Sequence, residues 1–352
     1  MQEFKYILII KLSAIGDVVH SIPFLEVMHR RFPHARIDWM VEENAYGVVK
    51  GHPALNRVIV SPRQTIAKKI KNPKEWLWIS KEAIRFFQEL RLCQYDLVID
   101  LQGLLKSGVL LGLSRGRKKM GMQGAREGAW CFTNEPAIPV HYNQHAIDRY
   151  VEVARYLGCH ILEWSGKIPF GACEQKGLGR ILSGKNINPN SPLVAINPVA
   201  RWQTKLWYPE KFACVADKIH EDLGCDIIFT GSRSDRPVID FILQHMNTRA
   251  FNLAGETSLK ELASLYSRCM AVVSTDTGPM HIAAAMGTRV VAIFGPTDPR
   301  MTGPYGDGHR VLWAEGLACT PCFKKLCDKK TCMKSISVGA VVDAVRDIVE
   351  TS

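Results

Sequence analysis

The sequence contains no apolar run that approaches the roughly 18 residues needed to cross a membrane. Its opening apolar stretch, Tyr6 to Ile10, is cut short by Lys11 and therefore lacks the core of a signal peptide. With 352 residues, of which 47% are hydrophobic, and a mean hydropathy of −0.04, the chain has the composition of a soluble protein large enough for two cores. We therefore expect a cytoplasmic protein.

A disulfide framework is also missing. The 11 cysteines are scattered through apolar segments, as at Cys93 and Cys214, so reduced thiols are the expected state. The one closely spaced group comprises Cys319, Cys322, Cys327 and Cys332. Four thiolates at this spacing are compatible with a structural zinc, but the spacing is looser than that of paired zinc knuckles, which favours a reduced or disulfide-linked surface loop.

Two further signals are absent. No Gly-x-Gly-x-x-Gly follows the first strand pattern of either half, which argues against a nicotinamide-dependent oxidoreductase. The basic clusters do not alternate with aromatic residues, as a groove that stacks nucleic-acid bases would. We therefore expect no nucleic-acid partner, and a basic RNA- or membrane-binding protein without catalysis is the alternative from a different functional class.

The chain carries a net charge of +11, and most of the excess lies in its first half. Residues 1–160 contain 23 Lys and Arg against 15 Asp and Glu, whereas residues 161–352 contain 22 against 19. Basic residues gather in two stretches that we interpret as loops or exposed helix edges, Arg63 to Lys74 and Arg115 to Lys119. A solvated face explains such clusters, but the excess favours an anionic membrane surface or an anionic substrate as the partner.

Strand and helix patterns alternate twice along the chain. The first half offers helical patterns at Ile22–Arg31 and Trp78–Arg91, and strands at Tyr6–Leu12, Arg36–Val41, Val58–Val60 and Leu97–Asp100. The second half repeats the scheme, with strands at Leu193–Asn197, Asp226–Thr230, Ala271–Ser274 and Arg289–Phe294. This layout predicts two doubly wound α/β domains, residues 1–182 and 193–335, joined by a linker at 183–192. A helical stripe of valines in residues 336–352 must pack on one of them.

The segment Ser274-Thr-Asp-Thr-Gly-Pro-Met-His281 follows an apolar strand and leads into a helix with Pro279 in its first turn. The free backbone N–H groups and the positive dipole end of such a helix suit a phosphate. The next strand ends in Gly295-Pro-Thr-Asp298, at the same edge of a parallel sheet, where α/β folds bind ligands. The second half is therefore predicted to bind a nucleotide.

Asp17 lies where the first strand passes into a helix through Lys11-Leu-Ser-Ala-Ile-Gly-Asp17. An aspartate in this position is commonly an N-cap, and that is one interpretation. Because the turn lies at the ligand-binding edge of its sheet, the carboxylate is also placed to serve as a general base.

Three motifs, taken in order, resemble the ADP-heptose:lipopolysaccharide heptosyltransferases, glycosyltransferase family 9. They are Lys11 to Pro23, Ile99-Asp-Leu-Gln-Gly-Leu-Leu-Lys-Ser107, and Ser274 to His281 followed by Gly295-Pro-Thr-Asp298. Within that family, Ile37-Asp-Trp-Met-Val-Glu-Glu43 and Gly124-Ala-Arg-Glu127 resemble heptosyltransferase I, which adds the first heptose to Kdo on lipid A. Heptosyltransferase II, or another ADP-heptose-dependent transferase, is the alternative.

The resemblance implies a GT-B fold, in which two Rossmann-like domains face a central cleft and a final helix returns to the N-terminal, acceptor-binding domain. It also implies an inverting, metal-independent transferase of lipopolysaccharide biosynthesis, without a cofactor, that takes ADP-heptose as its donor. Asp17 matches the family's general base, and Lys205 matches a lysine that contacts the phosphate or heptose region of the donor. The other donor-binding positions implied are Gly231, Ser232, Asp276, Thr277, Gly278 and His281.

Some of these positions have a plainer interpretation. The alternative for His281 is a helix histidine that packs against the sheet and forms its hydrogen bonds within the protein. Near the adenosine pocket implied at Gly231 and Gly255–Ser258, Ser258 with Glu261 is also an ordinary capping box. Arg233 stands where such enzymes tend to carry an acidic residue, so the usual contact to the adenosine ribose is not predicted.

Kdo carries a carboxylate and lipid A carries phosphates, which complement the basic first half. We expect the acceptor to contact Ser13, Lys106, Arg126 and Arg149. Alternatively, Arg149 pairs with Asp148 or Glu152 on an exposed helix, a contact worth little. The resemblance implies a peripheral protein on the anionic cytoplasmic face of the inner membrane.

Overall fold

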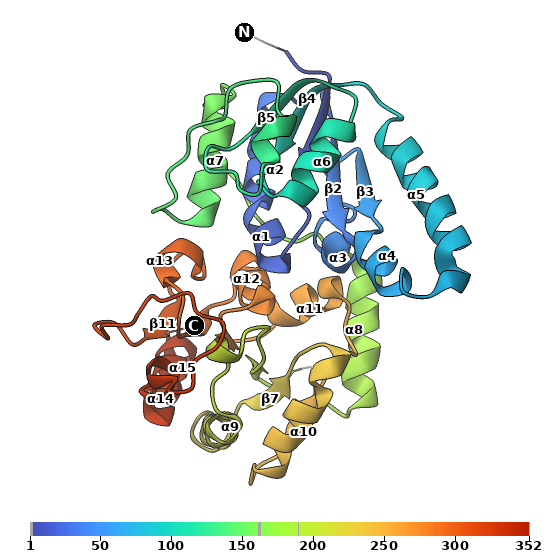
Figure 1. Ribbon diagram of the computed structural model, residues 1–352. Helices are drawn as coiled ribbons and strands as arrows, with labels where there is room; N and C mark the ends of the chain where they lie inside the picture. Colours follow the sequence, from blue (N-terminus) through green and yellow to red (C-terminus); the bar gives the residue numbers. More distant parts are fainter. Residues whose placement is uncertain (1–2, 161–162, 189, 352) are drawn as a thin grey trace. The chain divides into compact units, whose positions relative to one another are not determined.

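The computed structural model describes residues 3–160, 163–188 and 190–351, and the chain divides into two compact units, Met1–Pro169 and Phe170–Ser352. Each unit is built on its own parallel sheet, which confirms the predicted pair of doubly wound α/β domains (Figure 1). The division falls earlier than the expected linker at 183–192. The second unit begins with α8 (Ala172–Gly184), whose buried Leu178 and Leu182 lie on a helix that packs against α11 (Leu259–Tyr266).

The sheet of the first unit has five parallel strands in the order β3-β2-β1-β4-β5. These are β1 (Tyr6–Ile10), β2 (Arg36–Glu42), β3 (Arg57–Ser61), β4 (Tyr95–Asp100) and β5 (Gly116–Gly121). The four predicted strands are confirmed to within two residues. The prediction of a loop at Arg115 to Lys119 is wrong, because this segment enters β5. An edge strand accepts a row of charged side chains more readily than a central one, because it has a neighbouring strand on one side only.

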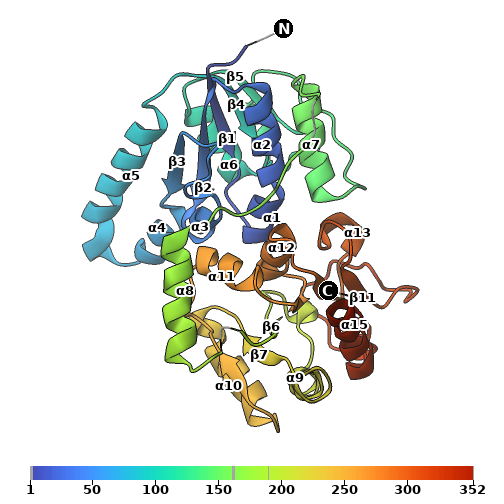
Figure 2. The ribbon, with the colours of Figure 1, turned by 180° about the vertical axis from the view of Figure 1, so that it is seen from behind.

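Helices cover both faces of this sheet. They are α1 (Ile15–His20), α2 (Ile22–Arg31), α3 (Tyr46–Val49), α4 (Arg63–Lys69), α5 (Trp76–Leu90), α6 (Leu105–Leu113) and α7 (Ala146–Tyr156), with 3-10 turns at Glu43–Ala45, Pro73–Glu75 and Ala129–Phe132. Helices α2 and α7 pack together on one face, and α5 and α6 lie on the other (Figures 1 and 2). On the second face, Leu8 and Ile10 of β1 share a buried cluster with one residue from each helix, Leu90 and Leu111.

The sheet of the second unit has six parallel strands in the order β11-β10-β9-β6-β7-β8. These are β6 (Leu193–Asn197), β7 (Asp226–Phe229), β8 (Ala250–Asn252), β9 (Ala271–Thr275), β10 (Val290–Phe294) and β11 (Arg310–Trp313). The prediction is confirmed for β6, β7, β9 and β10. It did not include β8 and β11, the two short edge strands. The remaining helices are α9 (Pro209–Leu223), α10 (Arg236–Gln244), α12 (Gly278–Ala285), α13 (Pro299–Thr302), α14 (Thr331–Lys334) and α15 (Val338–Glu350), with 3-10 turns at Gln203–Lys205 and Arg233–Asp235.

The valine stripe near the C-terminus forms α15, which packs on α9 within the second unit. Val341, Val345 and Ile348 are buried and join the core formed by β6, β7 and α9. The resemblance implies that this helix returns to the first domain. In the structure, the apolar side chains of α15 are buried against the second unit. Within the described part of the chain, none of the helices combines the length and apolarity that crossing a bilayer requires.

Candidate active site

Asp17 is the third residue of α1, which begins shortly after β1. Its side chain is half-buried, and its Oδ2 atom accepts a hydrogen bond of 3.0 Å from the backbone N–H of Ala14. Ala14 is therefore the N-cap residue, and Asp17 is an acidic residue of the first turn, where the helix dipole favours a negative charge. The N-cap interpretation of Asp17 is wrong, and its position at the sheet edge leaves it a candidate general base.

Lys11 lies between β1 and α1 and was not predicted as a site residue. Its side chain is buried, and Nζ donates hydrogen bonds of 3.1 Å to the carbonyl of Leu101 and 2.7 Å to the hydroxyl of Tyr150. Burial acts to lower the pKa of Lys11, but Tyr150 and the carboxylates of Asp17 and Asp100 raise it above its ordinary value. Lys11 therefore keeps its positive charge although its side chain is buried. The signal in the sequence was a lysine directly after an otherwise apolar strand.

Two of the predicted acceptor residues are in contact. Nζ of Lys106 donates a hydrogen bond of 2.7 Å to Oγ of Ser13 and lies 2.9 Å from Oε1 of Glu42. Glu42 also accepts hydrogen bonds from Arg63 (2.9 Å) and Gln64 (2.7 Å). Burial acts to raise the pKa of the Glu42 carboxyl, but these three donors hold it below its ordinary value. Glu42 was not predicted as a site residue, although it lies in the Ile37 to Glu43 motif.

The other two acceptor candidates are placed by different contacts. Arg126 is exposed, and its backbone N–H donates to the carbonyl of Gly103 (2.8 Å), which joins the Gly124 to Glu127 loop to the turn after β4. The guanidinium of Arg149, on α7, lies 4.6 Å from the centre of the Tyr142 ring. Its Nε atom is buried and has no hydrogen-bond partner among the described residues. Glu152, one proposed partner of Arg149, instead accepts a hydrogen bond from the backbone of His141 (3.3 Å).

In the second unit, Asp276 follows β9 and is buried. Its Oδ2 atom lies 2.5 Å from Nζ of Lys205 and accepts a hydrogen bond of 2.6 Å from Oγ1 of Thr297. Lys205 ends the 3-10 turn Gln203–Lys205, and its ammonium also lies 4.8 Å from the centre of the Trp202 ring. One oxygen of Asp276 is thus occupied by a cation and a hydroxyl, which fixes the position of the Lys205 charge.

The order of the strands explains why residues so far apart in the sequence meet. Lys205, Asp276 and Thr297 follow β6, β9 and β10, and these three strands are neighbours in the sheet. The carboxyl ends of parallel strands lie at one edge, so the three loops converge there. The same edge carries the start of α12, with Thr277 as N-cap, whose side chain makes no capping hydrogen bond, and Gly278 as the first helical residue. A helix N-terminus beside a lysine suits a diphosphate.

Gly231 and Ser232 follow β7, the next strand of the same sheet. The carbonyl of Gly231 accepts a hydrogen bond from the backbone of Gly255 (2.9 Å), and the Ser232 hydroxyl donates to Asp235 (2.6 Å). Gly255 has φ of +73°, and a Cβ atom there would lie 2.7 Å from Cα of Arg233. The two loops therefore pack backbone against backbone, which requires glycine at this position.

The positions with a plainer interpretation have the following surroundings. Ser258 and Glu261 form the capping box of α11, with hydrogen bonds of 3.3 and 2.8 Å. His281 is buried within α12. The four clustered cysteines are free, and Cys332 alone among them is buried. Across residues 3–160, 163–188 and 190–351, no group of three or more His, Cys, Asp or Glu side chains is arranged to hold a metal ion.

Comparisons with known proteins agree over most of the chain. The model of Glycosyltransferase family 9 (heptosyltransferase) matches residues 83–333. Lipopolysaccharide heptosyltransferase 1 of Pseudomonas aeruginosa is 31% identical over 91% of this chain and 87% of its own length. Lipopolysaccharide heptosyltransferase 3 of Escherichia coli K12 is 25% identical over 95% of each chain. The structure of E. coli heptosyltransferase WaaC with ADP is similar with a TM-score of 0.77 and 26% identity, covering 97% of this chain and 99% of that one.

Proposed function

The chain belongs to glycosyltransferase family 9, and from this premise we propose that it transfers heptose from ADP-heptose to Kdo of lipid A in the inner core of lipopolysaccharide. Its two parallel α/β domains match the GT-B architecture of heptosyltransferase structures. The first-heptose reaction is favoured over the second and third because the relative with 31% identity is a heptosyltransferase 1 and because the Gly124 to Glu127 motif is present. The proposed reaction is inverting and metal-independent.

The observation that carries this proposal is the convergence of Lys205, Asp276 and Thr297 beside the first turn of α12. When ADP leaves, negative charge grows on its terminal phosphate, and a fixed cation stabilises that charge more in the transition state than in the ground state. In our proposal Lys205 supplies the cation, and Asp276 and Thr297 hold it in place. Backbone groups of Thr277 and Gly278 bind the diphosphate, while Gly231 and Ser232 border the adenosine.

On the acceptor side, we assign the general base to Asp17, which takes the proton of the attacking Kdo hydroxyl. Lys106 and Arg126 bind the anionic groups of the acceptor. Arg149 adds a further cation, and its Nε has no hydrogen-bond partner among the described residues. The Glu42 carboxylate fixes Lys106 toward Ser13, so this lysine is oriented before the acceptor binds. Because the proposed acceptor is a membrane lipid, we also propose that the enzyme acts as a peripheral protein at the cytoplasmic face of the inner membrane.

A transfer assay with defined acceptors tests the proposal. With ADP-heptose as donor, we expect transfer to Kdo-lipid A that lacks heptose, and a slower reaction or none with the heptosylated form. Lys106→Ala or Arg126→Ala should raise the Michaelis constant for the acceptor by about tenfold, the size expected for one charged hydrogen bond, with donor affinity unchanged. Transfer to the heptosylated acceptor alone would refute the first-heptose assignment. No transfer from ADP-heptose to either acceptor would refute the function.

A further inference from the structure

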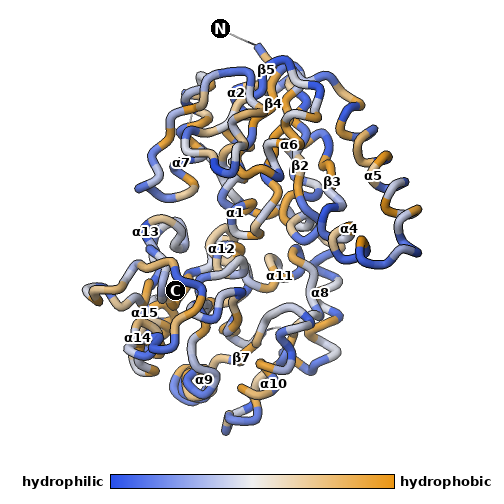
Figure 3. Tube along the Cα trace, in the orientation of Figure 1, coloured by the Kyte–Doolittle hydropathy of each residue, from blue (hydrophilic) through white to orange (hydrophobic). Residues whose placement is uncertain are grey.

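Helix α5 presents apolar side chains to solvent along most of its length. Of its 15 residues only Leu90 is fully buried. Trp76, Leu77 and Ile84 are 59%, 67% and 58% exposed. Figure 3 shows hydrophobic residues along α5 beside the hydrophilic turn that precedes it. A helix of this kind has an unpartnered apolar surface, which marks an interaction site in a soluble protein.

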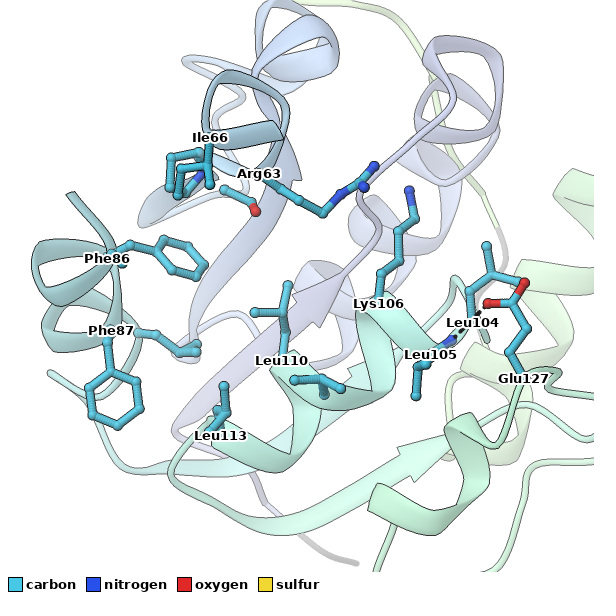
Figure 4. A pocket seen from close by; sticks show the side chains of 15 residues that line it. Arg63, Ile66, Phe86, Phe87, Leu104, Leu105, Lys106, Leu110, Leu113 and Glu127 are labelled. Carbon is cyan, nitrogen blue, oxygen red and sulfur yellow. Dashed lines mark hydrogen bonds between the residues drawn. The ribbon is translucent and has the colours of Figure 1, made fainter. Parts of the chain in front are cut away.

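A groove runs between α5 and α6 and continues this surface. It has a volume of about 810 Å³ and is lined mainly by apolar side chains, the exceptions being Ser61, Arg63, Lys106 and Glu127. Figure 4 shows Phe86 of α5 and Leu110 of α6 projecting into it from opposite sides, with Arg63 and Lys106 close together at one end. Arg63 and Lys106 are both paired with Glu42, so the groove offers mainly apolar surface and suits an alkyl chain.

The segment around this surface is strongly basic. Residues 63–91 contain eight Lys and Arg against three Asp and Glu. Two of the acidic residues are matched locally, because Glu75 pairs with Lys69 (2.9 Å) and Glu82 lies 3.6 Å from Arg85. Exposed lysines that form no ion pair within the described chain surround the apolar residues, at Lys68, Lys71, Lys74 and Lys81. Lysines around exposed tryptophan and leucine are typical of helices that lie in a membrane interface.

We propose that the surface formed by α4, α5 and α6 binds a bilayer of anionic phospholipids. Trp76, Leu77 and Ile84 enter the interface, the lysines bind lipid phosphates, and acyl chains of the leaflet occupy the groove. A two-fold contact with a second copy of the chain would set the same excess of positive charge against itself, which disfavours dimerisation through this face. The inference extends the proposed function, since an acceptor embedded in a membrane has to be reached there.

Vesicle sedimentation of the full chain tests the inference. The probes are vesicles of phosphatidylglycerol with phosphatidylcholine, and vesicles of phosphatidylcholine alone. We expect binding to the anionic vesicles, weakened by salt. The double variant Leu77→Asp/Ile84→Asp should reduce binding by about tenfold or more, because it removes two apolar insertions and adds two negative charges. The matched control is Val238→Asp/Phe241→Asp on α10, whose side chains are each 41% exposed and which should bind like the wild type.

Thermal unfolding checks that both variants are folded. The inference is overturned if the wild-type protein does not sediment with anionic vesicles, or if the α10 control loses as much binding as the α5 variant. It is also overturned if gel filtration shows a dimer that Leu77→Asp dissociates, which would assign the surface to a second copy. Sedimentation needs no donor or acceptor. A chain that binds vesicles but fails to transfer heptose would therefore refute the proposed function and leave this inference standing.

Discussion

The replacement Asp17→Asn separates the catalytic role of this residue from its structural one. The amide oxygen of asparagine can still accept the hydrogen bond of 3.0 Å from the backbone of Ala14, so the first turn of α1 keeps its geometry. What is lost is the negative charge and the ability to take a proton. The two roles predict effects of very different size.

The structural cost comes from the interaction between the carboxylate and the N-terminus of α1. Such an interaction contributes about 0.3–1 kcal/mol. In a domain of this size that loss lowers the melting temperature by about 1–4 °C. Loss of a general base lowers the rate by roughly 10²–10⁴, which corresponds to about 2.7–5.4 kcal/mol in the barrier. We therefore expect almost no transfer from a protein that is nearly as stable as the wild type.

The assay compares initial transfer rates, ADP binding by calorimetry and the melting temperature. The matched control is Glu174→Gln, because Glu174 is also the third residue of its helix, α8, and accepts a hydrogen bond from the N-cap backbone at Gly171 (2.8 Å). It should show a similar small loss of stability with full turnover. If Asp17→Asn turned over like the wild type, the assignment of the general base would be refuted. If, in addition, its melting temperature were lower, Asp17 would have a purely structural role.

Three further outcomes are expected. Lys205→Ala should lower the affinity for ADP, measured by calorimetry, and the turnover with saturating donor, each by about tenfold or more. If both values were unchanged, Lys205 would only pair with Asp276 and would have no role in binding the donor. Because the pKa of Glu42 lies below its ordinary value of 4.5, the stability it contributes is present above about pH 4.5 and is lost as the pH falls through its lower folded pKa. Urea midpoints of wild type and Glu42→Gln should therefore converge in acid, and a difference that stays constant with pH would contradict this. EDTA should leave the initial rate unchanged, and a loss that zinc restores would assign a metal to the loop Cys319–Cys332.

Strand positions could be predicted closely where the sequence is apolar throughout. Strand β6 was predicted without error, and β1 to within two residues, because central parallel strands are buried on both faces. Edge strands lack this signal. Strand β5 carries three consecutive basic residues, Arg117 to Lys119, and β4 is its one neighbouring strand in the described sheet. Its other side is hydrogen-bonded to a loop, at Asn134 and Ile138. Composition alone could not separate such a strand from a basic loop.

The boundary between the units and the exposure of α5 depended on tertiary contacts. Glycine and asparagine in residues 183–192 indicate a linker, but the helix before them buries Leu178 and Leu182 in the second unit, which moves the division to Pro169. The apolar pattern at Trp78–Arg91 predicted a helix, and the structure places α5 there. A periodic pattern specifies which face is apolar, and it does not specify whether the protein itself covers that face.

For Asp276, the sequence motif predicted the position of the residue but not its contacts. Its place after β9 and before α12 predicted a polar residue at the ligand-binding edge, and the structure confirms that position. Its partners could not be predicted, because Lys205 and Thr297 reach it only through the strand order β10-β9-β6. A buried carboxylate must be matched by a cation or by donors, and here one oxygen is occupied by both. In our proposal, the acidic residue of the motif therefore positions Lys205, and Lys205 contacts the phosphate of the leaving ADP.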